Sequence, residues 1–490
     1  PAETLSPWGG VWTGGILSGI FLMVLGFDYI SNLGRSSSAG QVFWNSLTRL
    51  PMKHNAVSYG ILALVLTVWA VSALLFATEE RAARAAGMWR SVAGIAGLSL
   101  LIGLIFWGWQ SGRLAALSQI SPTNQQQLIA QLRSFEGLLT TFYFFGLAGL
   151  FAAALVLPEA PQTYRSGNGM AAVAAPFLLI AVMVLATVTN LRIIQADIAF
   201  KMADPFTRGN QWPVAMVVYQ HAIDLAPNED YYYLFLGRAY LEQAKNLKTV
   251  DERRALFQQA EKDLKTAQRL NPLNTDHTAN LARLYSWWAS ATDNAQERQE
   301  YAQRSNVYYE KALSLSPNNV VLWGEWATLD LNFLKQPEAG LEKLNHALEL
   351  DDTYDRTYAL LGDYYLNQAR GAQDSQQRTE LLTKAVENYQ RALDVTPRAQ
   401  KQTRYLYNTA LGGAYIELKQ YPDAIAAYQE ALQFTGKGNR WRLEESLARL
   451  YAQVQDKENA VLQASNALND APQSEKERLQ TLLSQIQAMP

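Results

Sequence analysis

Residues 358–397 read YALLGDYYLNQARGAQDSQQRTELLTKAVENYQRALDVTP, and this stretch decides the fold of the larger part of the chain. Bulky and small residues alternate in it at helical spacing, at Tyr358, Leu361, Gly362, Tyr365, Ala385, Tyr389, Ala392 and Pro397. Small residues let two helices approach closely and large rings fill the space between them, while proline ends a helix because it cannot continue the hydrogen-bond ladder. The stretch therefore predicts two antiparallel helices that pack on each other.

The same spacing recurs along residues 192–490. It is found at Ala215, Tyr219 and Ala222 in a first, half-legible unit, at Leu236 and Gly237 in the next, and at Leu411 and Gly412 near the end. This is the tetratricopeptide pattern. It predicts an all-α solenoid of about seven helix pairs, followed by a terminal helix at 474–487 whose polar face caps the stack.

Three of the units are longer than the usual repeat. Pro227, Pro272 and Pro317 follow one another at intervals of 45 residues, whereas a tetratricopeptide unit has about 34. The excess of about three helical turns falls between the two helices, so we expect longer hairpins that project on one edge. Their polar stretches, such as 246–254 and 370–378, are either solvated tips or a rim that docks a partner.

The first 191 residues have a different composition. They hold 9 of the 42 basic and 6 of the 44 acidic residues of the chain, and five stretches lack charge altogether: 9–27, 55–78, 91–112, 137–158 and 166–191. Each is long enough to cross a hydrocarbon core of about 30 Å, and a soluble helix of this length would carry charge on its wet face. We therefore predict a membrane domain of five transmembrane helices at 1–191 and a repeat domain at 192–490.

The loop at 79–90 indicates the orientation of these helices. It is short and carries Arg81, Arg84 and Arg90, as expected of a cytoplasmic turn. By alternation, the loops at 28–54 and 113–136 lie outside the cytoplasm, and so does the repeat domain.

The composition also excludes several kinds of binding site and catalysis. Residues 192–490 hold 33 basic and 38 acidic residues, so they offer no basic face for nucleic acid. The absence of cysteine excludes thiolate catalysis and cysteine-ligated zinc. His221, His277 and His346 have no second metal ligand one turn away, and no phosphate-binding or nucleophile-elbow motif is present. We expect no metal, no cofactor and no catalysis by the repeats.

Aromatic residues cluster on the first helix of the repeat units. Adjacent rings cannot all face one core, because consecutive helical positions are about 100° apart. Two interpretations follow. Each ring taken alone is a packing residue, or the rings as a set line a concave groove that binds protein partners. The candidates for partner binding are Tyr231, Trp287, Trp288, Trp323, Trp326 and Tyr364.

A basic segment precedes the second apolar stretch. Arg49-Leu-Pro-Met-Lys-His-Asn55 places cations and the imidazole of His54 at a membrane interface. These side chains are either interfacial anchors or a site for a lipid diphosphate, in which Arg and Lys pair with phosphate and histidine acts as a general base.

Three features of the chain occur together: a His-Asn pair before an apolar helix, a late apolar stretch that runs into NLRIIQAD at 190–197, and the repeats at 226–240 and 271–285. In this combination the chain resembles the carboxy-terminal half of bacterial O-antigen ligase family proteins with tetratricopeptide tails. The resemblance implies the cytoplasmic membrane, with the repeats outside, and a lipid-linked glycan as substrate. It carries His54 over as the catalytic residue and Asn55 as a substrate-binding residue, with Arg35 and Arg49 as further substrate-binding candidates.

Two hypotheses follow for the function. In the first, the chain is a membrane-anchored scaffold whose repeats bind proteins, within a larger membrane assembly. In the second, it is an O-antigen ligase-like glycosyltransferase or polymerase that uses His54. The short segment at 28–53, which stands where the family has a large external loop, favours the scaffold.

Overall fold

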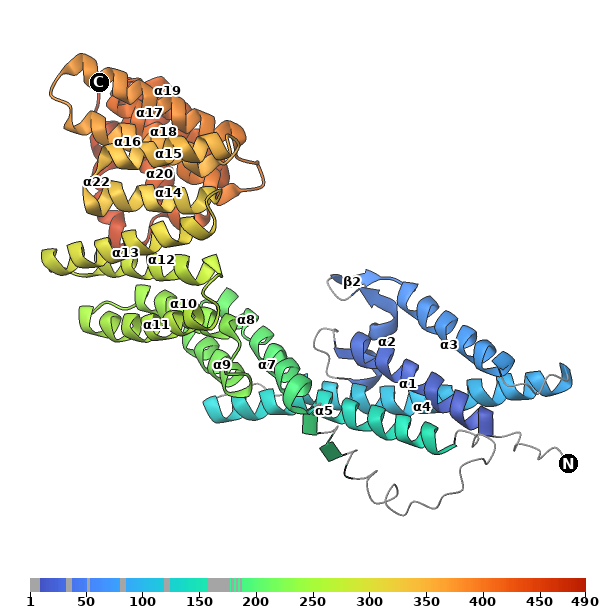
Figure 1. The fold of residues 1–490 in the computed structure, drawn as a ribbon. Coiled ribbons are helices and arrows are strands. Elements are labelled where there is room, and N and C mark those ends of the chain that lie inside the picture. The colour runs from blue at the N-terminus through green and yellow to red at the C-terminus, as the bar shows by residue number, and fades with distance from the viewer. Residues whose placement is uncertain are drawn as a thin grey trace, which may run out of the picture. The chain divides into compact units, whose positions relative to one another are not determined.

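The computed structural model describes residues 9–31, 38–50, 53–79, 85–118, 124–156, 177, 180–181, 184–185 and 187–490. They are almost entirely helical and form two compact units, 1–243 and 244–490 (Figure 1). The sequence places the change from membrane to repeat domain at residue 191. That boundary stays a prediction; the contacts divide the chain at 243, so the first repeat helices belong to the same unit as the apolar ones.

Unit 1 begins with apolar helices around α1 (Gly9–Ser31) and α4, which pack along each other. The elements are α2 (Ala39–Thr48), the hairpin of β1 (Arg49–Leu50) and β2 (Lys53–Val57), α3 (Gly60–Glu79), α4 (Ala85–Ser118) and α5 (Gln125–Val156). The indole N–H of Trp107 on α4 donates to the carbonyl of Leu22 on α1 at 2.7 Å. Glycines on α1 let the two backbones come close, since a β carbon at Gly15 would lie 2.6 Å from the side chain of Leu98.

Two helices of the described part are long and apolar enough to cross a membrane, with spans at Gly60–Ala77 and Met88–Leu117, and α1 has a shorter apolar segment, Val11–Phe27. The stretch at 137–158 falls mostly on α5, and most of 166–191 lies outside the described residues. The presence of five transmembrane helices therefore stays a prediction.

The expected start of the second apolar helix is wrong. Asn55 lies in β2, and α3 begins only at Gly60. The reason is local pairing: β2 bonds to β1, and the N–H of Ser58 donates to the carbonyl of Thr48 at 2.8 Å. These bonds hold the backbone extended until the chain has turned.

The first repeat helices pack against α5. They are η1 (Thr187–Leu191), α7 (Arg192–Lys201), α8 (Asp204–Arg208), α9 (Trp212–Leu225) and α10 (Asp230–Lys245). Leu128 and Leu132 of α5 are buried with alanines of α7 and α9. Nearby, Glu136 and the Nε2 atom of His221 lie 2.7 Å apart, and both side chains are buried. A single helix thus joins the apolar part of unit 1 to the first repeat.

Unit 2 is a series of helix pairs, each with a first helix A and a second helix B. In chain order they are α11 (Val250–Leu270), α12 (Thr275–Ala291), α13 (Ala295–Leu315), α14 (Val320–Leu329) with η2 (Asp330–Leu334), α15 (Pro337–Leu350), α16 (Asp355–Gly371), α17 (Ser375–Val395), α18 (Lys401–Glu417), α19 (Tyr421–Phe434), α20 (Lys437–Gln453) and α21 (Lys457–Asp470). Helices α12, α14, α16, α18 and α20 are A helices. After η3 (Gln473–Glu475), α22 (Lys476–Gln487) packs on α21 at the position expected of a cap.

In the pairs α16–α17 and α18–α19 a glycine of helix A lies against a tyrosine ring of helix B. A β carbon at Gly362 would lie 2.6 Å from Cε1 of Tyr389, and Ala385 and Ala392 on the same helix as Tyr389 are fully buried. The hydroxyl of Tyr389 donates to Asp363 at 2.6 Å. The quoted stretch thus folds as its spacing predicts.

The longer units gain their length in helix B. Helices α11, α13 and α17 have 21 residues, whereas α9, α15, α19 and α21 have 14. The B helices of the long units are therefore longer by about two turns, about 10 Å, and the hairpins that they form with the A helices are longer by this amount. Their ends carry ion pairs between neighbouring units, with Arg254 and Glu297 3.1 Å apart, and Arg370 2.8 Å from Glu417.

Adjacent glycines of α18 provide a test of the packing. A β carbon at Gly412 would overlap the ring of Tyr428, whereas at Gly413 it would meet no atom within 4 Å. Gly412→Ala should lower the free energy of unfolding by about 1–3 kcal/mol. Gly413→Ala, the matched control, should raise it by about 0.5–1 kcal/mol, because alanine favours a helix interior. Denaturant unfolding of both variants measures this, and equal effects would contradict the packing.

A buried carboxyl provides a second test. Asp263 on α11 is 8% exposed, and burial raises its pKa to about 6, against the smaller opposing effect of Lys262. Because the folded pKa lies above the unfolded one, the ionised carboxyl destabilises the fold above pH 6, and this cost disappears as the pH falls below about 4. Asp263→Asn should therefore raise stability at pH 7.5 by about 1–3 kcal/mol. A gain that is unchanged at pH 4 in thermal melts would contradict this cause.

Candidate protein-binding site

A groove lies along the A helices of three consecutive units, and we call it the A-helix groove. Its cavity volume is about 290 Å³. Helix α12 supplies Arg283, Ser286, Trp287 and Ser290, α14 supplies Glu325 and Thr328, and the remaining lining residues are Tyr309, Phe333 and Arg356. Stacking of successive units brings these residues together, since they come from helices α12 to α16.

An ion pair forms the floor of the A-helix groove. The Nε atom of Arg283 lies 2.8 Å from one carboxylate oxygen of Glu325 and 3.1 Å from the other. The hydroxyl of Tyr309 donates to Glu325 at 3.4 Å. Burial, followed by the charge of Glu325, raises the pKa of Tyr309 well above its ordinary value, so the phenol stays protonated. The charges of this floor are therefore already balanced.

The walls of the groove are open. Trp287 is 45% exposed, and the ammonium of Lys245 lies 4.2 Å from its ring centroid. Arg356 is exposed and forms no ion pair with any residue of the described chain. Ser286, Ser290 and Thr328 add hydroxyl groups. The groove thus offers an aromatic face, a cation that forms no ion pair in the described chain and several hydrogen-bonding groups.

Trp288, next in the sequence, has the opposite environment. It is 5% exposed and stacks on Tyr301 of α13, with ring centroids 4.5 Å apart, and it contacts Phe257 at 5.5 Å. Its ring fills the space between helices α11, α12 and α13. Of the two adjacent tryptophans, Trp288 belongs to the core and Trp287 to the groove.

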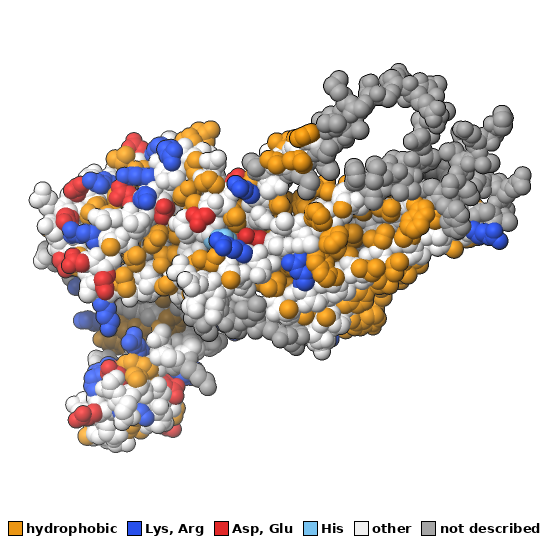
Figure 2. Space-filling model, turned by 90° about the horizontal axis from the view of Figure 1, so that it is seen from below, with side chains coloured by type: hydrophobic (Ala, Val, Ile, Leu, Met, Phe, Trp, Pro, Cys, Tyr) orange, Lys and Arg blue, Asp and Glu red, His pale blue; other side chains and the backbone are white. Residues whose placement is uncertain are grey.

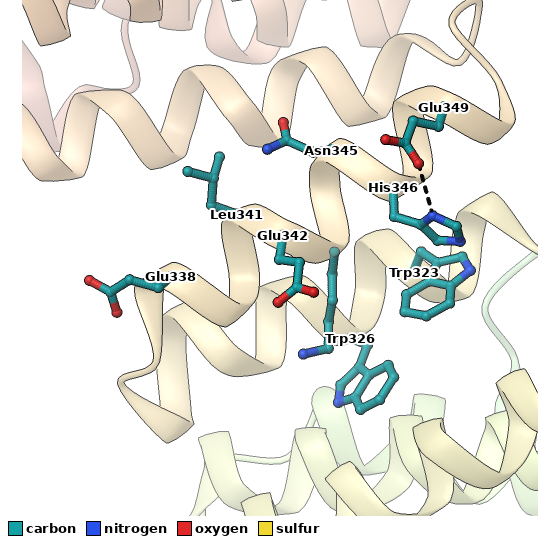
Figure 3. Close-up of a pocket in the computed structure, with 9 residues that line it drawn as sticks. Trp323, Trp326, Glu338, Leu341, Glu342, Asn345, His346 and Glu349 are labelled. Carbon is teal, nitrogen blue, oxygen red and sulfur yellow. Dashed lines mark hydrogen bonds and ion pairs between the residues drawn. The ribbon is translucent and has the colours of Figure 1, made fainter.

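A second cavity lies between α14 and α15, and we call it the α14–α15 pocket (Figure 3). Its volume is about 760 Å³. Trp323 and Trp326 enter it from α14 with their rings stacked at 5.6 Å. The other lining residues come from one face of α15: Glu338, Leu341, Glu342, Lys343, Asn345, His346 and Glu349.

The candidate partner-binding residues therefore lie in different places. Trp287 lines the A-helix groove, Trp323 and Trp326 line the α14–α15 pocket, and Trp288 is in the core. Tyr231 lies in unit 1, half-exposed, with its ring 4.6 Å from that of Phe235. Tyr364 of α16 is half-buried against Tyr365, at 5.1 Å. Within unit 2, the candidate tryptophans divide between the groove, the pocket and the core.

The four residues of the glycan hypothesis are less fully described. His54 and Asn55 lie in β2, and their side chains are outside the described part, as is the whole of Arg35. Arg49 lies in β1, where its Nε atom donates to the Oδ1 atom of Asn45 at 3.1 Å. In the ranges that the structure describes, no group of three or more His, Asp or Glu side chains is arranged to hold a metal ion.

The residue pattern and the helix pairs together define a helical solenoid of the tetratricopeptide type. No protein-family model matches the chain, and no curated protein matches it. Among solved structures, it is similar to Pseudomonas aeruginosa PilF, with 19% identity over 51% of this chain and 96% of that one, at a TM-score of 0.35. A tetratricopeptide repeat protein from Parabacteroides merdae is 13% identical over 60% of this chain and 98% of that one, at a TM-score of 0.38. YrrB, a TPR protein with an unusual peptide-binding site, is 16% identical over 44% of this chain and 92% of that one, at 0.27.

The adjacent tryptophans should differ in their effect on stability. Trp288→Ala leaves a cavity between three helices and should cost about 3–5 kcal/mol. Trp287→Ala removes a half-exposed ring and should cost about 1 kcal/mol or less. Melting curves of the two variants compare them directly. Similar losses of stability in both would mean that Trp287 is a packing residue.

Proposed function

We propose that this protein is a membrane-anchored tetratricopeptide scaffold that binds a peptide segment of a partner protein in the A-helix groove. The observation that carries the proposal is the exposed ring of Trp287 in the same cavity as Arg356, a guanidinium without an ion pair in the described chain. Tryptophan and arginine are the residues that most often dominate the energy of protein interfaces.

The chemistry of the groove indicates the kind of segment. Arg356 is suited to a carboxylate, because a guanidinium can hold it with two parallel hydrogen bonds. The hydroxyls of Ser290 and Thr328 already donate to the carbonyls of Trp287 and Gly324, so toward a peptide they can serve as acceptors, whereas Ser286 can donate or accept. Arg283 is less available, since Glu325 already holds it. We infer that the segment carries an acidic side chain or a terminal carboxylate.

Membrane anchoring is supported by apolar side chains on α3 and α4 that face outward. The span at Gly60–Ala77 is 17% buried and that at Met88–Leu117 is 28% buried, unlike the core helices of a soluble protein. Leu75, Leu101 and Ile105 are 59%, 56% and 65% exposed. Figure 2 shows hydrophobic side chains over much of the described surface of unit 1, where few charged ones lie. An apolar surface of this kind is stable in lipid and costly in water.

The orientation that we propose places the repeats outside the cytoplasm of a bacterial cell, with several spans in the cytoplasmic membrane. The arginines at 81, 84 and 90 support it, because cytoplasmic loops are enriched in basic residues. In this arrangement the A-helix groove faces partners in the cell envelope, within a larger membrane assembly.

A peptide array provides the binding test. The full chain in detergent is applied to random dodecapeptides, and the bound sequences should be enriched in Asp, Glu or free carboxyl termini. Trp287→Ala and Arg356→Ala should each weaken binding of these peptides at least about tenfold, or about 1.4 kcal/mol. Val307→Ala, which removes a 58% exposed side chain on α13, is the control and should change nothing. Unchanged binding by both groove variants would exclude this site.

Cysteine labelling tests the orientation. The chain has no cysteine, so single cysteines can be placed at Gln373, in the turn after α16, and at Ala86. In intact cells an impermeant maleimide should label the first and leave the second unlabelled until the membrane is opened. The reverse pattern would place the repeats in the cytoplasm.

A further inference from the structure

We propose that the α14–α15 pocket is a second binding site, separate from the A-helix groove, and that it takes an arginine side chain from a basic segment of a partner protein. The two sites share no lining residue. The groove offers a cation that forms no ion pair in the described chain, whereas this pocket offers aromatic faces and carboxylates. Its ligand therefore has the opposite charge.

The aromatic wall of the pocket is held in place by hydrogen bonds. The indole N–H of Trp323 donates to the carbonyl of Pro317, and that of Trp326 donates to Asn306 of α13, both at 2.7 Å. His346 lies edge-on to Trp323 at 4.7 Å. Because both indole N–H groups already have acceptors within the protein, neither ring needs a hydrogen bond from a ligand. A ligand therefore meets the apolar faces of the rings.

Two carboxylates on α15 lack a counterion. Glu338 and Glu342 lie one turn apart on the same face, and neither forms an ion pair with a described residue. Like charges at this spacing destabilise a helix by a few tenths of a kcal/mol. A third, Glu349, is 3.2 Å from the Nδ1 atom of His346. Figure 3 shows Glu342 directed toward the ring of Trp326, whereas Glu338 lies farther along the pocket and points away from the two rings.

The one ammonium that lines the pocket is already neutralised. Lys343 lies 2.6 Å from a carboxylate oxygen of Asp330, whose side chain is 1% exposed and whose other oxygen has no hydrogen bond within the described chain. The same ammonium lies 4.3 Å from the ring centroid of Trp326. The pocket thus already holds a cation against an indole, and the charge that remains unbalanced is negative.

Arginine fits these features better than lysine does. A guanidinium is planar, stacks on an indole and pairs with a carboxylate through two hydrogen bonds, and it is less strongly hydrated than an ammonium. A volume of about 760 Å³ also exceeds one side chain, so the flanking residues of the segment can enter with it.

Short labelled peptides test this site on the full chain in detergent. The probes are Gly-Ser-Arg-Gly-Arg-Ser-Gly and versions in which lysine, the neutral isostere citrulline, or glutamate replaces both arginines. In fluorescence anisotropy the arginine peptide should bind at least about tenfold more tightly than the citrulline peptide, and the glutamate peptide should not bind. Equal binding of the arginine and citrulline peptides would overturn the proposal.

Charge-matched variants separate this site from general electrostatic attraction. Glu338→Gln with Glu342→Gln should weaken the arginine peptide about tenfold or more. Glu310→Gln with Glu387→Gln removes the same charge from exposed positions on α13 and α17 and should leave binding unchanged. Trp287→Ala should also leave it unchanged, because that ring belongs to the A-helix groove. Equal losses in the two double variants, or a loss in Trp287→Ala, would contradict a separate site.

Discussion

The close approach of a small residue on one helix to a tyrosine ring on its partner is the constraint on which the repeat region depends. Gly362 against Tyr389 and Gly412 against Tyr428 set the distance between helices A and B, and buried alanines such as Ala385 keep it along the pair. Fixing this distance fixes which faces of the A helices remain uncovered. The A-helix groove is lined mainly by such faces, and the α14–α15 pocket by one face of α14 together with residues of the B helix α15.

The sequence predicts this part of the fold well, because every unit repeats the same local rule. It predicts the helix pairs, the ends of the helices near Pro272 and Pro317, and the final helix α22. It predicts longer hairpins in three units but not that helix B takes the extra residues, since a polar stretch such as 370–378 is compatible with either a loop or a solvated helix end. The apolar stretches predict helices, but Asn55 joins a hairpin because a strand partner at Arg49 competes with the helix.

The candidate site is harder to predict. That one of Trp287 and Trp288 faces outward follows from helical geometry, but which one does depends on where α13 places Tyr301. The pairing of Arg283 with Glu325 joins residues of two successive A helices and needs the stacking of units. The sequence signal for this ion pair is the presence of oppositely charged residues at similar positions of consecutive A helices. The buried Asp330 lies in the π-helical turn η2, and the periodicity of the sequence does not predict this turn.

Helix α5 has a mechanical consequence for unit 1. It is continuous over 32 residues, about 48 Å, and it carries apolar residues at one end and Leu128, Leu132 and Glu136 against the first repeat at the other. A continuous helix resists bending, so it acts as a lever. Under the proposed membrane anchoring, a tilt of the apolar end of α5 would move His221 and the helix that bears it, so that a change in the bilayer would reach the first repeat as a torque.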